Sequence, residues 1–287
     1  MSLSIALSLT MLLGVGCAAQ PTDAPAPQPE PVRAPVPTTA PQDTVQPPRA
    51  DDGAITPDSS IDQILDALDR RGENLRTLAA DVALVESNAA TGDELTRTGS
   101  FALELRPDGS ARSRVAFNDK VANDRKTSDR IEYLLDGPNL IDRTYRTKTE
   151  VTRQVLRPGE RINLLKLGEG PFPLPIGQDR AEVLKMFDVT KVAPDAQADP
   201  KQFQSVHVKL VPKPGSQFAD QFKSIDAWVD VSDHMPKRIE TVDASGVEVR
   251  TTELTNVRVN EKLSDATFAL EKLPDGWTLL NEAYDRR

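Results

Sequence analysis

Alternating apolar and polar residues fill the last third of the chain, from residue 206 to residue 279. Val, Ile and Thr are frequent in this part, for example over 206–213 and 247–260. Turn residues separate the alternating segments, as in the Asp-Ala-Ser-Gly sequence at 243–246. A period of two places the apolar side chains of a strand on one face. The segments, including a short closing one at 268–270, therefore predict sequential antiparallel strands whose apolar face something else must cover.

The same alternation occurs upstream and predicts a second run of strands. Its longest segment, 95–106, places Phe101, Leu103 and Leu105 on one face, and a Pro-Asp-Gly turn follows at 107–109. Both parts of the folded chain are thus expected to be β-sheet. In this first run, other strands are expected over 78–84, 115–117, 131–135, 140–145 and 149–156.

A helix is expected to precede the first strand. Ser60 and Gln63 have the spacing of a capping box. Ile64, Leu65 and Leu68 then recur at helical spacing, which gives the helix a single apolar stripe. Such a helix needs a sheet to lie on.

Residues 157–192 interrupt the strand pattern. Pro158 and the leucines that follow it indicate a short helix, whereas the Pro- and Gly-rich sequence 168–177 suits neither a regular helix nor a central strand. Asp179 is a suitable N-cap for a second short helix through Val183, Leu184 and Phe187. Because the interruption is apolar but irregular, we expect it to lie across the apolar face of the sheet. The alternative is a surface excursion between two halves of the sheet.

The first 57 residues are predicted to lie outside the folded domain, which spans 58–287. Residues 1–16 contain an uncharged apolar run, shorter than the roughly 20 residues that a membrane-spanning helix needs, and predict an export signal peptide. Eleven of the 23 prolines lie between Pro21 and Pro57, with few large apolar residues between them. Such a composition cannot bury enough surface to offset its ordering entropy, so 17–57 is predicted to be a disordered tether.

Cys17 is the only cysteine, which excludes a disulfide within the monomer. The Gly-Val-Gly-Cys sequence that it ends resembles the lipobox of bacterial lipoproteins, and this resemblance implies a diacylglycerol anchor on Cys17. Gly14 stands where that pattern usually has leucine, and no Lys or Arg precedes the apolar run. The alternative is an ordinary signal peptide with an incidental cysteine. Ala18 gives no signal for retention in the inner membrane, so the outer membrane is the expected destination.

The sequence offers little chemistry for catalysis. Its formal charge is −9 with few basic clusters, which disfavours nucleic acid as a partner. His207 and His234 are the only histidines and have no second ligand at zinc spacing, so no metal or cofactor is expected. Neither a Gly-x-Ser-x-Gly elbow nor a P-loop occurs. We therefore expect no enzyme, with a hydrolase that uses paired carboxylates as the alternative left open.

The order of the expected elements resembles that of the LolA/LolB family of lipoprotein carriers. The resemblance implies an α+β fold, a curved antiparallel incomplete β-barrel (a half-barrel) with helices closing its concave face. In that family the cavity holds the acyl chains of lipoproteins or related lipids. The matching motifs are Leu-Ala-Ala-Asp-Val at 78–82 after the opening helix, 99–105 leading into Arg106-Pro107, Asp136-Gly137 before a strand, Leu-Val-Pro-Lys at 210–213, and Phe268, Leu270, Pro274 and Gly276 near the end.

An apolar pocket between an open half-barrel and its helices would be a common type of ligand site. By the same resemblance, Arg106 is expected to bond backbone carbonyls of the lid helices and control closure; the alternative is a solvated arginine at a strand end. The residues expected to line the cavity, or else to be plain core packing, are Val82, Leu84, Phe101, Leu103, Val115, Phe117, Tyr133, Leu165 and Phe187.

The expected protein is a cell-envelope lipoprotein that faces the periplasm of a Gram-negative-type bacterium. It would bind lipid or acyl chains in an apolar cavity and serve lipoprotein or lipid trafficking to the outer membrane. Its expected partners are those acyl chains, the membrane through the N-terminal anchor, and an envelope protein. The alternative is an envelope-stress sensor or scaffold of the RseB type, which binds a protein partner.

Overall fold

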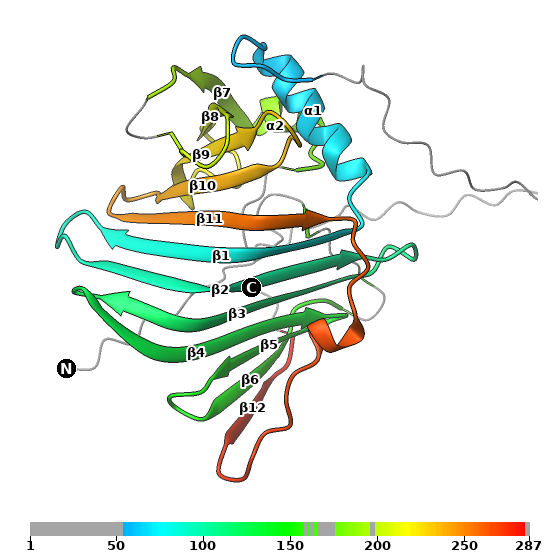
Figure 1. The fold of residues 1–287 in the computed structure, drawn as a ribbon, viewed down its shortest axis with the longest axis vertical. Coiled ribbons are helices and arrows are strands. Elements are labelled where there is room, and N and C mark those ends of the chain that lie inside the picture. The colour runs from blue at the N-terminus through cyan, green and yellow to red at the C-terminus, as the bar shows by residue number, and fades with distance from the viewer. Residues whose placement is uncertain (1–53, 158–159, 161–163, 166–175, 196–198, 285–287) are drawn as a thin grey trace, which may run out of the picture.

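The computed structural model describes residues 54–157, 160, 164–165, 176–195 and 199–284. Within these ranges, 12 strands form one curved sheet that does not close (Figure 1). The α+β incomplete barrel predicted from the sequence is therefore confirmed. The strands are β1 (Thr77–Asn88), β2 (Glu94–Leu105), β3 (Ala111–Ala122), β4 (Arg125–Asp136), β5 (Asn139–Thr144), β6 (Thr149–Gln154), β7 (Phe187–Val192), β8 (Ser205–Pro212), β9 (Phe222–Asp230), β10 (Pro236–Asp243), β11 (Glu248–Val259) and β12 (Thr278–Glu282).

Two antiparallel meanders make up the sheet. One runs from β1 to β6 and the other from β7 to β11, and they join because β1 pairs with β11. Strand β12 then pairs in parallel with β6 at the far edge. The sheet order is β12-β6-β5-β4-β3-β2-β1-β11-β10-β9-β8-β7.

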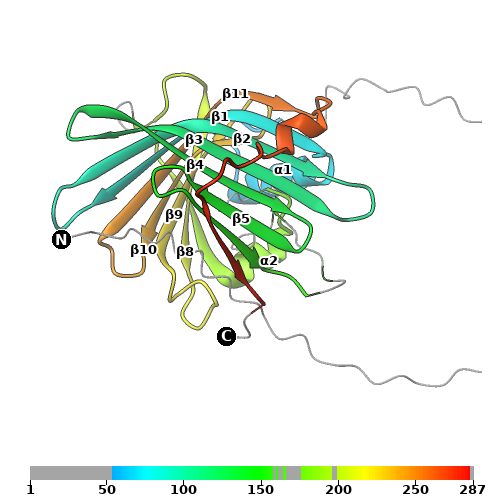
Figure 2. The same ribbon diagram turned by 90° about the horizontal axis from the view of Figure 1, so that it is seen from below.

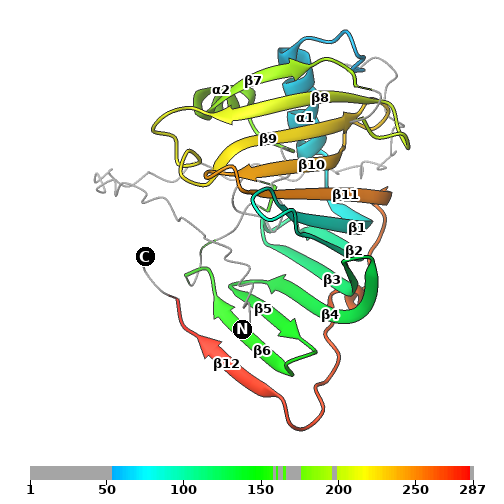
Figure 3. The same ribbon diagram turned by 90° about the vertical axis from the view of Figure 1, so that its left-hand side faces the viewer.

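Helix α1 (Ile61–Glu73) begins at the capping box expected from the sequence. The backbone N–H of Gln63 donates to Ser60 Oγ at 3.3 Å, and the Ser60 N–H donates to Gln63 Oε1 at 2.8 Å. Its apolar stripe, including Ile64 and Leu68, is buried in the main core. Figure 3 shows α1 behind strands β7 to β9. The face of the sheet that packs in this core is called the inner face below.

Helix α2 (Arg180–Met186) confirms the second predicted helix. Asp179 caps it by accepting a hydrogen bond from the Glu182 N–H at 3.0 Å, and Val183 is buried. Phe187, expected within this helix, instead begins β7, which pairs with β8. The predicted short helix after Pro158 falls mostly outside the described residues; Leu164 and Leu165 are buried in the main core.

Bulges bend the sheet near its middle. The pairing register shifts between Thr98 and Gly99 where β2 meets β3, and between Phe117 and Asp119 where β3 meets β4. Another shift, after Ala79, lies between β1 and β11. A bulge adds an unpaired residue to one strand and increases the local twist and bend. The clustered bulges therefore account for the curvature of the sheet.

The end of the chain departs from the prediction of a strand at 268–270. A short 3₁₀ helix, η1 (Asp265–Phe268), stands there, and Phe268 packs with Ala102 and Leu134 in a second, smaller core cluster. The sequence neighbours of Ala102 and Leu134 belong to the main core. Because adjacent strand residues point to opposite faces, η1 lies on the outer face. Figure 2 shows residues 261–277, the crossing segment, running over the sheet from β11 to β12.

The main core joins both meanders to the helices. It contains residues of α1, of β1 to β4 and of β7 to β11. Ile55, at the end of the predicted tether, is also buried there. None of the helices described is long and apolar enough to cross a membrane.

Candidate functional site

Strand pairing brings the predicted lining residues of the first meander onto one face. Leu78 lies opposite Leu103, Phe101 opposite Val115, and Val115 opposite Tyr133. Directly paired residues of antiparallel strands point to the same face. Val82, Leu84, Phe101, Leu103, Val115, Phe117, Leu165 and Phe187 are all buried in the main core, and Tyr133 packs against it partly buried. The structure thus unites all nine predicted residues in one apolar cluster; their contact with lipid stays a prediction.

Tyr133 stands where this apolar cluster meets charged side chains. Burial raises the pKa of its phenol to about 12, and the nearby carboxylate of Asp142 acts in the same direction. Asp142 lies opposite Tyr133 in the pairing of β4 with β5. Burial likewise raises the pKa of Asp142, against the attraction of Arg153. The inner face is therefore apolar over one part and ionic over the next.

Sequence reasoning missed this ionic part. Arg97 pairs with Leu84 on β1 and with Lys120 on β3, which places both cations on the inner face. Both meet Asp129, with Arg97 Nη1 at 2.9 Å and Lys120 Nζ at 3.4 Å from its Oδ2 atom. The signal was available, because Arg97 precedes Phe101 by four residues and a period of two puts them on the same face.

Arg106 lies at the end of β2, as expected. Its guanidinium pairs with Glu104 at 3.5 Å and with Asp136 at 3.4 Å. Glu104 also accepts a hydrogen bond from Arg112, which contacts η1 on the outer face. In the described residues Arg106 is thus held by acidic side chains. Its control of a lid stays a prediction.

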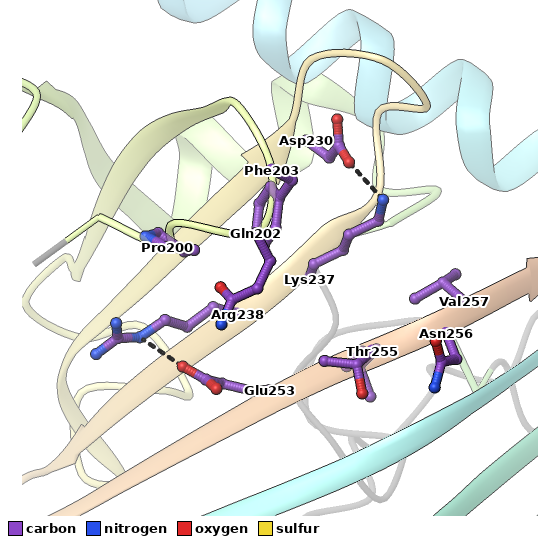
Figure 4. Close-up of a pocket in the computed structure, with 11 residues that line it drawn as sticks. Pro200, Gln202, Phe203, Asp230, Lys237, Arg238, Glu253, Thr255, Asn256 and Val257 are labelled. Carbon is purple, nitrogen blue, oxygen red and sulfur yellow. Dashed lines mark hydrogen bonds and ion pairs between the residues drawn. The ribbon is translucent and has the colours of Figure 1, made fainter.

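Two pockets occur in the described part, and of the nine predicted lining residues only Val82 borders one of them. One, of about 310 Å³, borders β10 and β11 and is lined by Phe203, Lys237, Arg238 and Glu253 among others (Figure 4). The other, of about 420 Å³, lies beside the bulged region of β1 to β3 and includes Asp81, Ser100 and Asp119. Charged and polar groups lie beside apolar ones in both pockets, so neither is the wholly apolar site expected for an acyl chain.

The two histidines lie in separate places. His207 Nε2 lies 2.9 Å from Asp226 Oδ1, and its ring stacks on Trp228 with 4.1 Å between centroids. His234 sits in the turn between β9 and β10 with a φ of 58°, and burial lowers its pKa. Among the residues that the structure describes, no group of three His, Cys, Asp or Glu side chains could hold a metal ion.

Comparison with known proteins gives matches only among solved structures. Neither a protein-family model nor a curated protein matches this sequence. The structure of the MucA/MucB complex of Pseudomonas aeruginosa matches with a TM-score of 0.43 and 11% identity over 72% of this chain, which covers 61% of that chain. This chain thus spans about three fifths of that relative.

Two smaller structures also match. LprF from Mycobacterium bovis has a TM-score of 0.39 and 16% identity, with 70% of this chain and 93% of LprF covered. A LolA superfamily protein from Nitrosomonas europaea has a TM-score of 0.32 and 13% identity, with 74% of this chain and 98% of that chain covered. At these identities the likeness concerns the fold alone. The last protein bears the name of the family that the sequence motifs resemble.

Proposed function

We propose that this protein is a non-catalytic binding protein of the bacterial cell envelope whose inner face holds the acyl chains of a lipid or lipoprotein. The observation that carries the proposal is the nine-residue apolar cluster, which joins the inner face of a sheet that stays open to the residues packed over that face. An open sheet can part from its cover without breaking its own strand pairing. Each buried CH₂ of a bound chain would contribute about 0.8 kcal/mol.

Acyl chains would enter by replacing side-chain contacts between the inner face of the first meander and the residues packed over it, called the cover here. Phe187 of β7 stacks on Phe218 with centroids 5.0 Å apart, and Leu165 is buried beside the same core. These residues come from outside the first meander, whose face carries Phe101 and Phe117. Separation of the two groups would open an apolar slot between them.

The proposal also includes an N-terminal anchor: a signal peptide at 1–16, a lipidated Cys17 and a tether at 17–57. The protein would face the periplasm and be anchored in the outer membrane. Residues 1–53 lie outside the described part of the chain. Mass spectrometry of the mature protein tests the anchor, because the diacylglycerol adds its mass to a peptide that begins at Cys17. If the mature protein lacks the mass of the diacylglycerol, Cys17 is not lipidated and this part of the proposal is wrong.

Native mass spectrometry of the protein, prepared without detergent, tests the binding. We expect a co-purified lipid, or uptake of an added one. Replacing Phe117 with Asp should abolish it, whereas Ser100→Ala, an exposed change on the opposite face of β2, should not. A parallel measurement of the free energy of unfolding separates lost binding from lost folding. Repeated absence of lipid from the folded wild-type protein contradicts the proposal.

A protein partner is the second candidate. The observation that favours it is strand β12, an edge strand whose Leu279 and Leu280 are 61% and 47% exposed. An exposed edge can accept an additional strand from another chain. If the protein is an envelope sensor or scaffold, the double variant Leu279→Ser and Leu280→Ser should no longer bind its protein partner, and its lipid content should stay the same.

A further inference from the structure

The inner face changes from apolar to cationic along a single strand. On β2, Phe101 and Leu103 are buried in the main core, whereas Arg97 shares their face and lies opposite Leu84. Lys120 lies opposite Arg97 on β3. The apolar and the cationic parts are therefore continuous, with no intervening element in the sheet.

Three cations meet one carboxylate at this place. Asp129 Oδ2 lies 2.9 Å from Arg97 and 3.4 Å from Lys120, and its Oδ1 lies 3.7 Å from Nε of Arg146. The Asp129 side chain is only 5% exposed. Burial alone would raise the pKa of Asp129, but the hydrogen bond from Arg97 and the attraction of Lys120 outweigh it and lower the pKa. Asp129 therefore stays ionised at neutral pH and holds the cations together.

The positive charges exceed what Asp129 neutralises. Other ions of the inner face form separate groups: Arg250 meets Glu86 at 3.4 Å and Glu248 at 3.2 Å, and Asp142 meets Arg153 at 3.6 Å. Arg153 also meets Glu282 at 2.7 Å, farther along the sheet. The excess of positive charge is thus local to the residues around Asp129, named here the cationic rim: Arg97, Lys120 and Arg146.

The donors of the cationic rim are open to an incoming anion. The side chains of Lys120 and Arg146 are 30% and 71% exposed, whereas that of Arg97 is 14% exposed. Guanidinium and ammonium groups donate charge-assisted hydrogen bonds to phosphate oxygens. A phosphate is therefore the group that this arrangement suits best.

The length of β2 from the rim to the end of its apolar part is similar to the length of a lipid molecule. From Arg97 to Leu103 the strand advances about 20 Å at roughly 3.3 Å per residue. The acyl chains of one leaflet span about 15 Å, half of the roughly 30 Å hydrocarbon core of a bilayer. A lipid whose chains lie along the apolar part of β2 would place its headgroup at the rim.

We propose that the cationic rim binds the phosphate of an anionic lipid headgroup while the acyl chains of the same molecule lie on the apolar part of the inner face. This inference rests on the proposed binding of acyl chains and adds the class of lipid. A zwitterionic lipid with the same chains binds more weakly, because its own cation opposes the excess charge of the rim.

Calorimetric titration of the full protein with short-chain lipids tests the inference. The probes are dihexanoyl phosphatidylglycerol and dihexanoyl phosphatidylcholine, which have identical chains. We expect the anionic lipid to bind at least about tenfold more tightly, which corresponds to about 1.4 kcal/mol. The double variant Lys120→Gln and Arg146→Gln should lose this preference, because it weakens the binding of phosphatidylglycerol more than that of phosphatidylcholine.

A matched control removes two exposed cations from elsewhere. Lys126 pairs with Asp119 at 3.0 Å and is 66% exposed, and Lys223 is exposed on β9. The double variant Lys126→Gln and Lys223→Gln has the same net charge as the rim variant and should keep the preference. If the control loses it as well, net charge is the cause and the inference fails.

Each of the other outcomes also supports or overturns the inference. Equal binding of both lipids to the wild-type protein overturns the rim inference and leaves acyl-chain binding intact. Binding of neither lipid overturns both. Titration with inorganic phosphate separates a lipid headgroup from a free anion: if phosphate alone binds as tightly as phosphatidylglycerol and the rim variant abolishes it, the rim is an anion site without a lipid.

Discussion

Gly72 in the last turn of α1 and Gly177 lie backbone to backbone, so that a Cβ atom on Gly72 would stand 2.1 Å from the Cα of Gly177. The Gly177 N–H donates to the carbonyl of Leu68 at 3.0 Å in the same contact. Helix α1 and the segment that leads into α2 therefore touch through their main chains. The cover of the inner face is held together at this point.

Gly72→Ala should lower the free energy of unfolding. The added methyl group meets backbone atoms that cannot move aside, and overpacking of this kind costs about 1–3 kcal/mol. The helix propensity of alanine offsets up to about 1 kcal/mol of that loss. Urea denaturation measures the change, with Glu73→Ala, an exposed residue of the same turn, as the control. A variant as stable as the wild type would contradict the close contact.

Gly99→Ala should destabilise the bend of the sheet. A Cβ atom on Gly99 would lie 1.9 Å from the carbonyl oxygen of Ala116, beside the bulge between β2 and β3. Relief of this clash requires the strands to separate, so we expect a loss of about 2 kcal/mol or more. Ser100→Ala, one residue along and exposed, is the control for thermal or urea unfolding. Equal effects of the two substitutions would argue against the contact.

Glu132 should make the stability of the protein depend on pH. Burial alone would raise the pKa of its carboxyl group, but hydrogen bonds from Tyr145, Arg114 and Arg130 hold the pKa below its ordinary value. A carboxyl group with a depressed folded pKa stabilises the protein above its unfolded pKa of about 4.3 and loses that effect as pH falls through the folded value.

Glu132→Gln should therefore cost about 1–3 kcal/mol at pH 7, since it removes a charged acceptor from two arginines. The gap between wild type and variant should begin to narrow as pH falls below the unfolded pKa of about 4.3, where the unfolded carboxyl group takes up a proton, and should narrow further as pH falls through the lower folded pKa. Unfolding by urea at several pH values measures both effects. The exposed Glu94→Gln is the control, and a gap that stays constant with pH would refute the assignment.

Arg112 should hold the crossing segment on the outer face. Its guanidinium donates to Glu104 at 2.6 Å and to Asp265 at 2.7 Å, and it lies 4.1 Å from the ring centroid of Phe268. Arg112→Met removes these contacts, so we expect faster amide hydrogen exchange over 263–270. Arg238→Met is the matched control, because Arg238 lies over the ring of Trp228 on another strand. Exchange should be unchanged over 263–270 in the control.

Local signals in the sequence predicted the local structure well. Ser60 with Gln63, and Asp179, each specify a helix start through hydrogen bonds within three residues, so no distant partner is needed. The strands that alternate cleanly, such as β8 and β11, were predicted at nearly their observed bounds. Their apolar faces carry enough residues to reveal the period of two.

The elements that depend on distant partners could not be predicted in this way. All residues of β12 are exposed, so no alternation marks it, and only its pairing with β6 makes it a strand. Phe268 looked like a strand residue because it is apolar, yet it packs against Ala102 and Leu134 from a 3₁₀ turn. The sequence could have predicted part of the cationic rim, because the alternation of side chains along β2 places Arg97 on the same face as Phe101. What the sequence does not reveal is that Asp129 would meet it from β4.

The pairing of β6 with β12 has a consequence for how the protein acquires its structure. A chain that is synthesised or exported from its first residue onward presents 149–154 long before 278–282 exist to pair with them. During that interval the first meander carries an unsatisfied row of backbone donors and acceptors, to which a second nascent molecule could attach. Folding of this protein in the cell should therefore depend on a chaperone that shields that border until synthesis is complete.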